Sequence, residues 1–241
     1  MLRTLITGIA LAVIIPIAGA IGMVAVWLAG SPRPLYVIAF PTARGLLRVA
    51  GIRLRVSGRD RLDPEATYVF VANHVSNVDP PLAFLAIGRD IRALAKAAVF
   101  KLPVFGAVLR AAQFPPVHRD DREGSKRAVD IAAAALREGH DFLVFAEGTR
   151  SAEGQLQAFK KGPFVMAIKA QVAVAPMVVR GTYGIQPKGR LAITPGVAEI
   201  EFLSPIPTRG LVFGDRNELR DRTHDAIAEA LAGMPAKTGL Q

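Results

Sequence analysis

Apolar residues in this chain gather in short uninterrupted runs that end in polar loops, a pattern typical of buried strands. Three such runs cover residues 68–72, 142–146 and 172–179. A fourth segment, residues 190–206, alternates apolar and polar positions and predicts a β-hairpin. The sequence therefore predicts a sheet whose strands lie inside the protein.

Segments with a helical spacing of apolar residues lie between and after these strands. They cover residues 80–87, 129–136 and 217–234, and the last of them is typical of an amphipathic helix that covers a surface. Asp79 stands where a helix N-cap belongs, and Pro80 stands at the first helical position. Because strands alternate with helices, we expect an α/β domain with a mixed sheet flanked by helices.

The N-terminal segment, residues 5–29, carries no charged side chain and is long enough to cross a hydrocarbon core of about 30 Å as one helix. It is longer than the apolar region of a cleaved signal peptide, so we expect it to remain as a membrane anchor. Pro16 lies inside it, which leaves a re-entrant helical hairpin within one leaflet as the alternative. A second apolar patch, residues 35–49, fits a helix at the membrane interface, and a buried core helix is the alternative.

The chain is expected to divide into two parts. Residues 1–56 form the membrane anchor with its interfacial helix, and residues 57–241 form the α/β domain, beginning with a charged, turn-rich stretch. Five arginines follow the apolar segment: Arg33, Arg44, Arg48, Arg53 and Arg55. By the positive-inside rule they predict that the domain lies on the cytoplasmic side of the cell (inner) membrane.

Charge and composition narrow the range of partners. The 30 lysines and arginines exceed the 20 acidic residues, and the net charge of +10 favours an acidic membrane, phosphorylated substrates or nucleic acid. Nucleic acid is the weakest of these, because the arginines lack interleaved aromatic residues and the apolar anchor would be unexplained. The chain has no cysteine, which excludes disulfides, thiolate zinc sites and a cysteine nucleophile. No G-x-S-x-G elbow, P-loop or dinucleotide fingerprint occurs.

The loop after the first predicted strand carries His74 and Asp79, a pair able to perform acid–base chemistry. Their spacing of five would not place both on one face of a continuous helix, whereas a bend brings them together. A carboxylate bonded to one imidazole nitrogen fixes the tautomer and leaves the other nitrogen as a general base. The plainer alternative is that Asp79 only caps the helix and His74 is an ordinary loop histidine.

A second polar loop follows the run at 142–146. It consists of Glu147, Gly148, Thr149, Arg150 and Ser151. The glycine lets a ligand approach the backbone, and Thr149 and Arg150 offer donors to an oxyanion, to which the nearby Lys160 and Lys161 can add. The loop therefore predicts a phosphate site, and the alternative is a surface turn in which Glu147 pairs with Arg150.

Taken together and in order, these motifs resemble those of the glycerolipid acyltransferases of the PlsC type, and among them the 1-acyl-sn-glycerol-3-phosphate acyltransferases. The matching blocks are NHVSNVDP at 73–80, a basic stretch ending in Arg119, FAEGTRS at 145–151 with FKKG at 159–162, and Pro176. The likeness covers roughly residues 35–210. H-x4-D followed about 70 residues later by E-G-T-R is far more specific than either motif alone.

The resemblance implies direct transfer of a fatty acyl group from acyl-CoA or acyl carrier protein to the sn-2 hydroxyl of lysophosphatidic acid, giving phosphatidic acid in phospholipid biosynthesis. It implies His74 as the general base and Asp79 as the residue that orients it. Residues 147–150 match the block that binds the acceptor, and Arg150, with Arg119 and Lys101, would hold the phosphate. No cofactor and no metal are implied; the acyl donor is a co-substrate.

Two departures from the family pattern bear on these expectations. Ala146 replaces the proline of F-P-E-G-T-R, which removes rigidity but no functional group. The segment QFPPVHR, residues 113–119, replaces a block that often ends in I-x-R, and this bears on the acceptor more than on the reaction type. Two alternatives therefore stay open. One is a related acyltransferase acting on glycerol 3-phosphate, another lysophospholipid or a lyso-ornithine lipid; the other is a non-enzymatic membrane protein that binds anionic lipid and has no need of His74.

Overall fold

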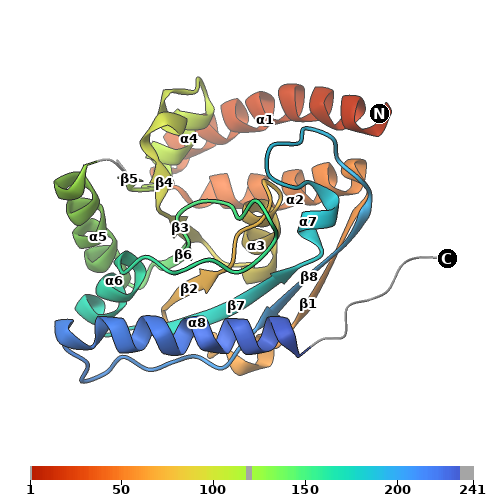
Figure 1. The fold of residues 1–241 in the computed structure, drawn as a ribbon. Helices are drawn as coiled ribbons and strands as arrows, with labels where there is room; N and C mark the ends of the chain where they lie inside the picture. The colour runs from red at the N-terminus through yellow and green to blue at the C-terminus, as the bar shows by residue number, and fades with distance from the viewer. Residues whose placement is uncertain (1, 118–120, 234–241) are drawn as a thin grey trace.

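The computed structural model describes residues 2–117 and 121–233 and shows a six-stranded sheet between two layers of helices (Figure 1). The strands of this sheet are β1 (Ile52–Ser57), β2 (Tyr68–Ala72), β3 (Ile91–Ala93), β6 (Asp141–Phe145), β7 (Ala173–Arg180) and β8 (Gly196–Phe202). The helices are α1 (Leu2–Ala29), α2 (Arg33–Ala50), α3 (Asp79–Ile87), α4 (Phe105–Ala111), α5 (Arg122–Arg137), α6 (Gly162–Ala170), α7 (Thr182–Ile185) and α8 (Arg216–Ala232). A separate small ladder joins β4 (Ala95–Lys96) to β5 (Pro116–Val117).

The strand order is β1-β8-β7-β2-β6-β3, and the neighbouring strands run parallel except for the antiparallel pair β7 and β8. The predicted α/β class with a mixed, helix-flanked sheet is confirmed. Strand β2 coincides with the predicted run at both ends, and β6 and β7 each lie one residue from their predicted bounds. Parallel central strands with helices on both sides explain why these runs are apolar throughout.

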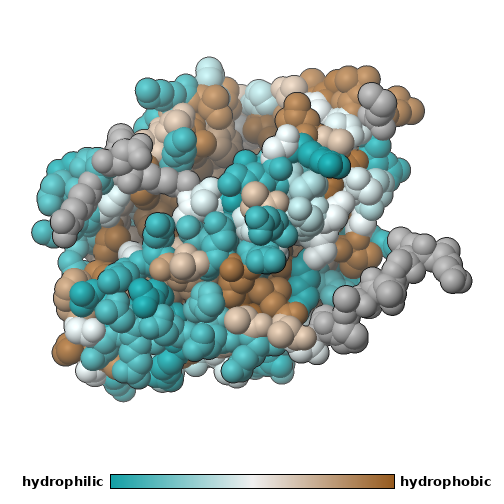
Figure 2. Space-filling model, in the orientation of Figure 1, coloured by the Kyte–Doolittle hydropathy of each residue, from teal (hydrophilic) through white to brown (hydrophobic). Residues whose placement is uncertain are grey.

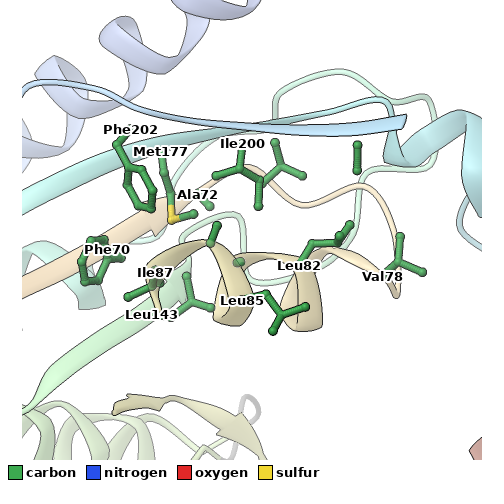
Figure 3. Close-up of a cluster of buried hydrophobic side chains, with 14 of the residues drawn as sticks. Phe70, Ala72, Val78, Leu82, Leu85, Ile87, Leu143, Met177, Ile200 and Phe202 are labelled. Carbon is green, nitrogen blue, oxygen red and sulfur yellow. The ribbon is translucent and has the colours of Figure 1, made fainter. Parts of the chain in front are cut away.

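Alternate residues of β2 enter two different hydrophobic clusters. Tyr68, Phe70 and Ala72 belong to a cluster beneath α2 and α3, which Figure 3 shows in close-up with Phe70 facing Phe202 and Met177. Val69 and Val71 belong to the opposite cluster, against α5, α6 and α8. Since both faces are covered, the strand is fully buried and its carboxyl end is held rigidly for the loop that follows.

The prediction of a hairpin at residues 190–206 is wrong. The segment forms one strand, β8, whose residues Ala198, Ile200 and Phe202 alternate into the core, which is the source of the period-two pattern. Strand β8 pairs with β1 along one edge and with β7 along the other, so no edge is left for a hairpin partner.

The first strand of the sheet is β1, and all of it except its last residue, Ser57, lies in the segment expected to belong to the anchor. Its alternate residues are partly exposed, in the pattern of an edge strand, so it lacks the continuous apolar run that marks the central strands. The structure therefore places β1 in the sheet of the α/β domain. The boundary between anchor and domain at residues 56 and 57 stays a prediction.

Helices α1 and α2 form a hairpin across one end of the domain (Figure 1). Two glycines let α1 approach its neighbours, because a Cβ at Gly19 would lie 2.6 Å from Val104 Cγ1 and one at Gly22 would lie 2.7 Å from Leu35 Cδ2. The outer side of α1 is apolar and exposed, and Figure 2 shows this hydrophobic surface. By length and composition α1 is able to cross a membrane; whether it spans or re-enters stays a prediction.

Candidate active site

Two loops meet at the carboxyl edge of the parallel strands. The His74 loop, residues 73–78, follows β2, and the Glu147 loop, residues 147–151, comes two residues after the end of β6. Strands β2 and β6 are adjacent and parallel, so their carboxyl ends bring both loops to the same edge of the sheet. That edge is where open α/β sheets bind their ligands.

The His74 and Asp79 side chains are hydrogen-bonded, with Nδ1 of the imidazole 2.8 Å from Oδ2 of the carboxylate. The same Oδ2 accepts hydrogen bonds from the backbone N–H groups of Val75 and Ser76, each 2.7 Å long. A carboxylate oxygen has no proton to donate, so the Nδ1 position carries the hydrogen and Nε2 is left as the basic nitrogen. The imidazole also stacks on Phe145, with ring centroids 4.2 Å apart, which fixes the plane of the ring.

Asp79 does not act as the N-cap of its helix, contrary to the prediction. Helix α3 begins at Asp79 itself, Val78 occupies the cap position, and Pro80 is the second helical residue. The carboxylate is completely buried and turned back toward the His74 loop. Its hydrogen bonds therefore close the bend between strand and helix and bring His74 and Asp79 together across a sequence spacing of five.

The His74 loop is also fixed by Asn73 and Ser76, two residues within the matching block for which the sequence predicted no role of their own. The Asn73 side chain forms two hydrogen bonds with the backbone of Val179 on β7, 2.9 and 2.8 Å long. Ser76 Oγ donates to the carbonyl of Gln186, 2.7 Å away. Polar residues in a loop were the available signal for these contacts, but their partners lie more than 100 residues away, beyond any local pattern.

Glu147 is buried and points at the backbone of His74, whose N–H donates to Glu147 Oε1 over 2.8 Å. Gln157 Nε2 donates to the other carboxylate oxygen over 2.7 Å. The carbonyl of His74 accepts from the N–H of Ser151 at 2.8 Å, so both backbone groups of His74 are bound by the Glu147 loop. The alternative in which Glu147 pairs with Arg150 is not observed: the described residues contain no such ion pair, and the carboxylate is engaged elsewhere.

Burial raises the pKa of the Glu147 carboxyl above its ordinary value. The hydrogen bonds from the His74 backbone and the Gln157 side chain, the charge of His74 and the Gln157 backbone act in the opposite direction. The family resemblance implies that Glu147 belongs to the block that binds the acceptor, and this role stays a prediction. In the structure its carboxylate is turned inward and supports the loop that carries His74.

The remaining residues of the Glu147 loop form its outer face. Gly148 has a φ of +75°, a left-handed conformation that favours glycine, and a Cβ there would lie 3.4 Å from Cγ of Lys160. Thr149 is exposed, and Arg150 is half-buried with no side-chain ion pair among the residues that the structure describes. Lys188 Nζ donates to the carbonyl of Arg150 at 2.8 Å, which adds another cation beside this loop. The outer face is therefore cationic and suited to an anion.

Lys101 and Arg119 are also predicted to hold the phosphate, but the structure does not place either of them at the Glu147 loop. Lys101 ends a short 3-10 helix, residues 97–101, is exposed, and makes no hydrogen bond to the Glu147 loop in the described structure. Arg119 lies outside the described residues. Their assignment to the phosphate stays a prediction carried by the family resemblance alone.

An apolar cavity of about 600 Å³ lies beside the His74 loop, between the helical hairpin and the sheet. Asn77 and Val78 of the loop line it, together with Ile15 of α1, Ala43 of α2 and Phe84 of α3. This volume lies within the range of roughly 300–1,000 Å³ usual for small-molecule sites. The cavity joins the N-terminal hairpin to the loop that carries the His74–Asp79 pair.

A family model described as Acyltransferase matches residues 53–180, more than half of the 241-residue chain. The chain belongs to the acyltransferase family. The matched range contains the His74–Asp79 pair and the Glu147 loop, so the resemblance inferred from their motifs is confirmed.

Individual relatives agree with this assignment. A 1-acyl-sn-glycerol-3-phosphate acyltransferase of Cocos nucifera is 29% identical over 168 residues, which cover 69% of this chain and 54% of that protein. The alpha form from Homo sapiens is 30% identical over 183 residues, which cover 73% of this chain and 63% of the human protein. The chain thus spans about half the length of the coconut relative. The crystal structure of the 1-acyl-sn-glycerophosphate (LPA) acyltransferase PlsC from Thermotoga maritima superposes with a TM-score of 0.84 at 25% identity, covering 98% of this chain and 97% of that one.

Proposed function

We propose that this protein is a membrane-bound lysophosphatidate acyltransferase, which transfers a fatty acyl group from acyl-CoA or acyl carrier protein to the sn-2 hydroxyl of 1-acyl-glycerol 3-phosphate. The observation that carries the proposal is the 2.8 Å contact between His74 Nδ1 and Asp79 Oδ2, in a loop whose residues Asn77 and Val78 line an apolar cavity of about 600 Å³. The names of the relatives in coconut, human and Thermotoga maritima support the choice of acceptor. The product, phosphatidic acid, places the reaction in phospholipid synthesis.

The proposed chemistry is a direct transfer with His74 as general base. Nε2 accepts the proton of the acceptor hydroxyl while the hydroxyl oxygen attacks the carbonyl carbon of the thioester. The new ester bond forms as the C–S bond of the thioester breaks. The imidazolium then returns the proton to the departing thiolate. Asp79 stabilises the positive ring through Nδ1–H and keeps its orientation, as a carboxylate does behind a catalytic histidine.

The acceptor phosphate is assigned to the outer face of the Glu147 loop. Arg150 has no ion pair of its own in the described structure, and Thr149 is exposed beside it. A guanidinium binds two oxygens of a phosphate at once, which suits a dianionic headgroup. An acceptor without phosphate would leave this arginine without a partner.

The acceptor is tested by measuring thiol release from palmitoyl-CoA in detergent with a panel of acceptors. The panel contains lysophosphatidic acid, glycerol 3-phosphate, a lysophospholipid with a larger headgroup, lyso-ornithine lipid and monoacylglycerol. We expect turnover to be fastest with lysophosphatidic acid. Faster turnover with another member would show that this member is the acceptor and would leave the proposed chemistry unchanged. The absence of turnover with every member, with either palmitoyl-CoA or an acyl carrier protein as donor, would favour a lipid-binding module.

The variant Arg150→Ala is expected to raise the KM for lysophosphatidic acid roughly tenfold to a hundredfold, because it removes a charge-assisted contact to the phosphate. Turnover of monoacylglycerol, which has no phosphate, should change little, so the preference for the phosphorylated acceptor should shrink. Arg209→Ala, which removes an exposed arginine after β8, is the matched control. Equal losses with both acceptors would assign Arg150 to the fold instead of the phosphate.

We assign the apolar cavity to the acyl chain, because its lining is apolar and includes Asn77 and Val78 of the His74 loop. Ala43 lies on its wall, and a phenylalanine there would occupy part of the volume. Ala43→Phe is therefore expected to favour shorter acyl donors. Losing the burial of two methylenes, about 0.8 kcal/mol each, corresponds to roughly a tenfold change in relative kcat/KM. Val37→Phe on the exposed side of the same helix is the control, and an unchanged chain-length profile for Ala43→Phe would reject the assignment.

For the membrane we propose that the α1–α2 hairpin is the anchor and that the domain faces the cytoplasm. The packing of α1 against α2 and α4 favours an arrangement in which the hairpin enters one leaflet with its exposed apolar side. The chain has no cysteine, so a single cysteine introduced at Leu2 can be labelled from either side of a sealed vesicle. The labelled side distinguishes a hairpin from a full span.

A further inference from the structure

Gln157 lies ten residues after Glu147, between the matching blocks 145–151 and 159–162, and its side chain reaches back to the Glu147 loop. Its amide Nε2 donates to Glu147 Oε2 at 2.7 Å and lies 3.3 Å from the carbonyl of Thr149. The opposite oxygen of Glu147 accepts the N–H of His74 at 2.8 Å. A continuous chain of hydrogen bonds therefore runs from Gln157 through the buried carboxylate to the backbone of the general base.

The carboxylate in the middle of this chain is costly to bury. Glu147 is only 3% exposed, and no cationic side chain of the described residues forms an ion pair with it. A buried carboxylate must be stabilised by hydrogen bonds or it becomes protonated. The side-chain donor is Gln157; the other donors are backbone groups, and His74 is the titratable group that acts on the carboxylate through its charge.

We propose that Gln157 is a positioning residue for the acyl transfer, which holds Glu147 as an oriented carboxylate and through it fixes the backbone of His74. The inference rests on the proposed function, in which His74 is the base. Gln157 touches no reacting atom in this scheme. Its effect is to keep the Nε2 atom of His74 at the position that the acceptor hydroxyl must meet.

The role has a signature in the pH profile. Without the Gln157 amide, the balance of burial and hydrogen bonding moves the pKa of Glu147 further upward, so the carboxyl becomes protonated at a higher pH. A protonated Glu147 accepts the His74 N–H more weakly, because charge-assisted hydrogen bonds are the stronger kind. Loss of the amide should therefore harm activity most on the acidic side.

Three variants test this. Gln157→Met keeps the length of the side chain and removes the donor, and we expect kcat to fall roughly tenfold to a hundredfold, the effect of a small misplacement of a reacting group, with little change in KM. The acid limb of its pH–rate profile should move to higher pH. Gln157→Glu places a second carboxyl against Glu147. The activity of this variant relative to the wild type should therefore fall as pH rises and recover at lower pH, where the two carboxyls can share a proton. Gln155→Met is the matched control, because Gln155 is exposed on the same segment and its side chain has no hydrogen bond within the described residues.

A purely structural role would lower activity equally at every pH and in the same direction for both Gln157 variants. That outcome, or wild-type kinetics in Gln157→Met, would overturn the proposal. The turnover of the wild type in the same assay separates the proposed acyltransferase function from the positioning role of Gln157. An inactive wild type would count against the proposed function and would not bear on Gln157.

A second measurement needs no turnover. The chain has four histidines, so protein labelled with 15N-histidine gives four backbone amide signals, and the one absent from His74→Gln is that of His74. Because this N–H donates to Glu147, its chemical shift should follow the protonation of that carboxyl. We expect the midpoint of the shift to be higher in Gln157→Met than in the wild type. Identical midpoints would refute the proposal whether or not the protein transfers acyl groups.

Discussion

Replacing His74 with alanine is expected to reduce kcat for acyl transfer by roughly 10²–10⁴-fold, the usual contribution of a general base. The fold should persist, because the backbone N–H and carbonyl of His74 bond to Glu147 and Ser151 without the side chain. Among the residues that the structure describes, the side chain itself has one hydrogen bond, to Asp79, and a stacking contact with Phe145. The variant therefore separates chemistry from folding.

The measurement is thiol release from palmitoyl-CoA with lysophosphatidic acid, together with the thermal unfolding midpoint in the same detergent. His140→Ala is the control, since that histidine precedes β6 at the opposite edge of the sheet from His74. Turnover in His74→Ala within a few-fold of the wild type would remove His74 from the mechanism. An equal loss in His140→Ala would point to general damage.

The second large effect is expected at Asp79, where charge and shape can be varied separately. Asp79→Asn keeps an oxygen able to accept from Val75 and Ser76 but loses the negative charge behind the imidazole. We expect kcat to fall roughly 10²–10⁴-fold with little change in the unfolding midpoint, because the uncharged side chain neither stabilises the imidazolium nor enforces its tautomer.

Asp79→Ala should in addition destabilise the protein. It removes the acceptor of three hydrogen bonds and leaves the N–H groups of Val75 and Ser76 buried without a partner. We expect a loss of roughly 3–5 kcal/mol, seen as a fall of about 6–20 °C in the unfolding midpoint. If Asp79→Asn were as unstable as Asp79→Ala, the negative charge of the carboxylate would be required for the fold. The loss of activity in Asp79→Asn would then no longer support a catalytic role for Asp79.

The local pattern of apolar residues predicts the central strands of the sheet but does not predict the edge strand β1. Strand β2 is buried on both faces, so its apolar run marks it in the sequence. Strand β1 is an edge strand with partly exposed residues, so no continuous apolar run marks it in the sequence. The alternation before and within β8 predicts a hairpin, although the segment forms one strand, because one strand with a buried and a polar side has the same period as two.

The site divides in a similar way. The motifs that contain His74, Asp79 and Arg150 could be found from residue type and spacing, because that chemistry requires those side chains in order. The inward direction of Glu147 could not, since it depends on where β6 ends relative to β2. Gln157 carried no signal, as a glutamine in a loop acquires meaning only from the carboxylate that it contacts.

The sequence by itself determined the family, the α/β class, the long apolar N-terminal helix and the choice of His74 and Asp79 as the proposed catalytic pair, because each of these depends on local order or on short motifs. The tertiary structure alone decided that Asp79 closes the His74 loop instead of capping α3, that β8 has both edges occupied, and that the Glu147 loop supports His74 from behind. It also placed an apolar cavity between the hairpin and the sheet. These features arise where segments distant in sequence meet, and the free energy of that packing is not encoded in any one segment's pattern.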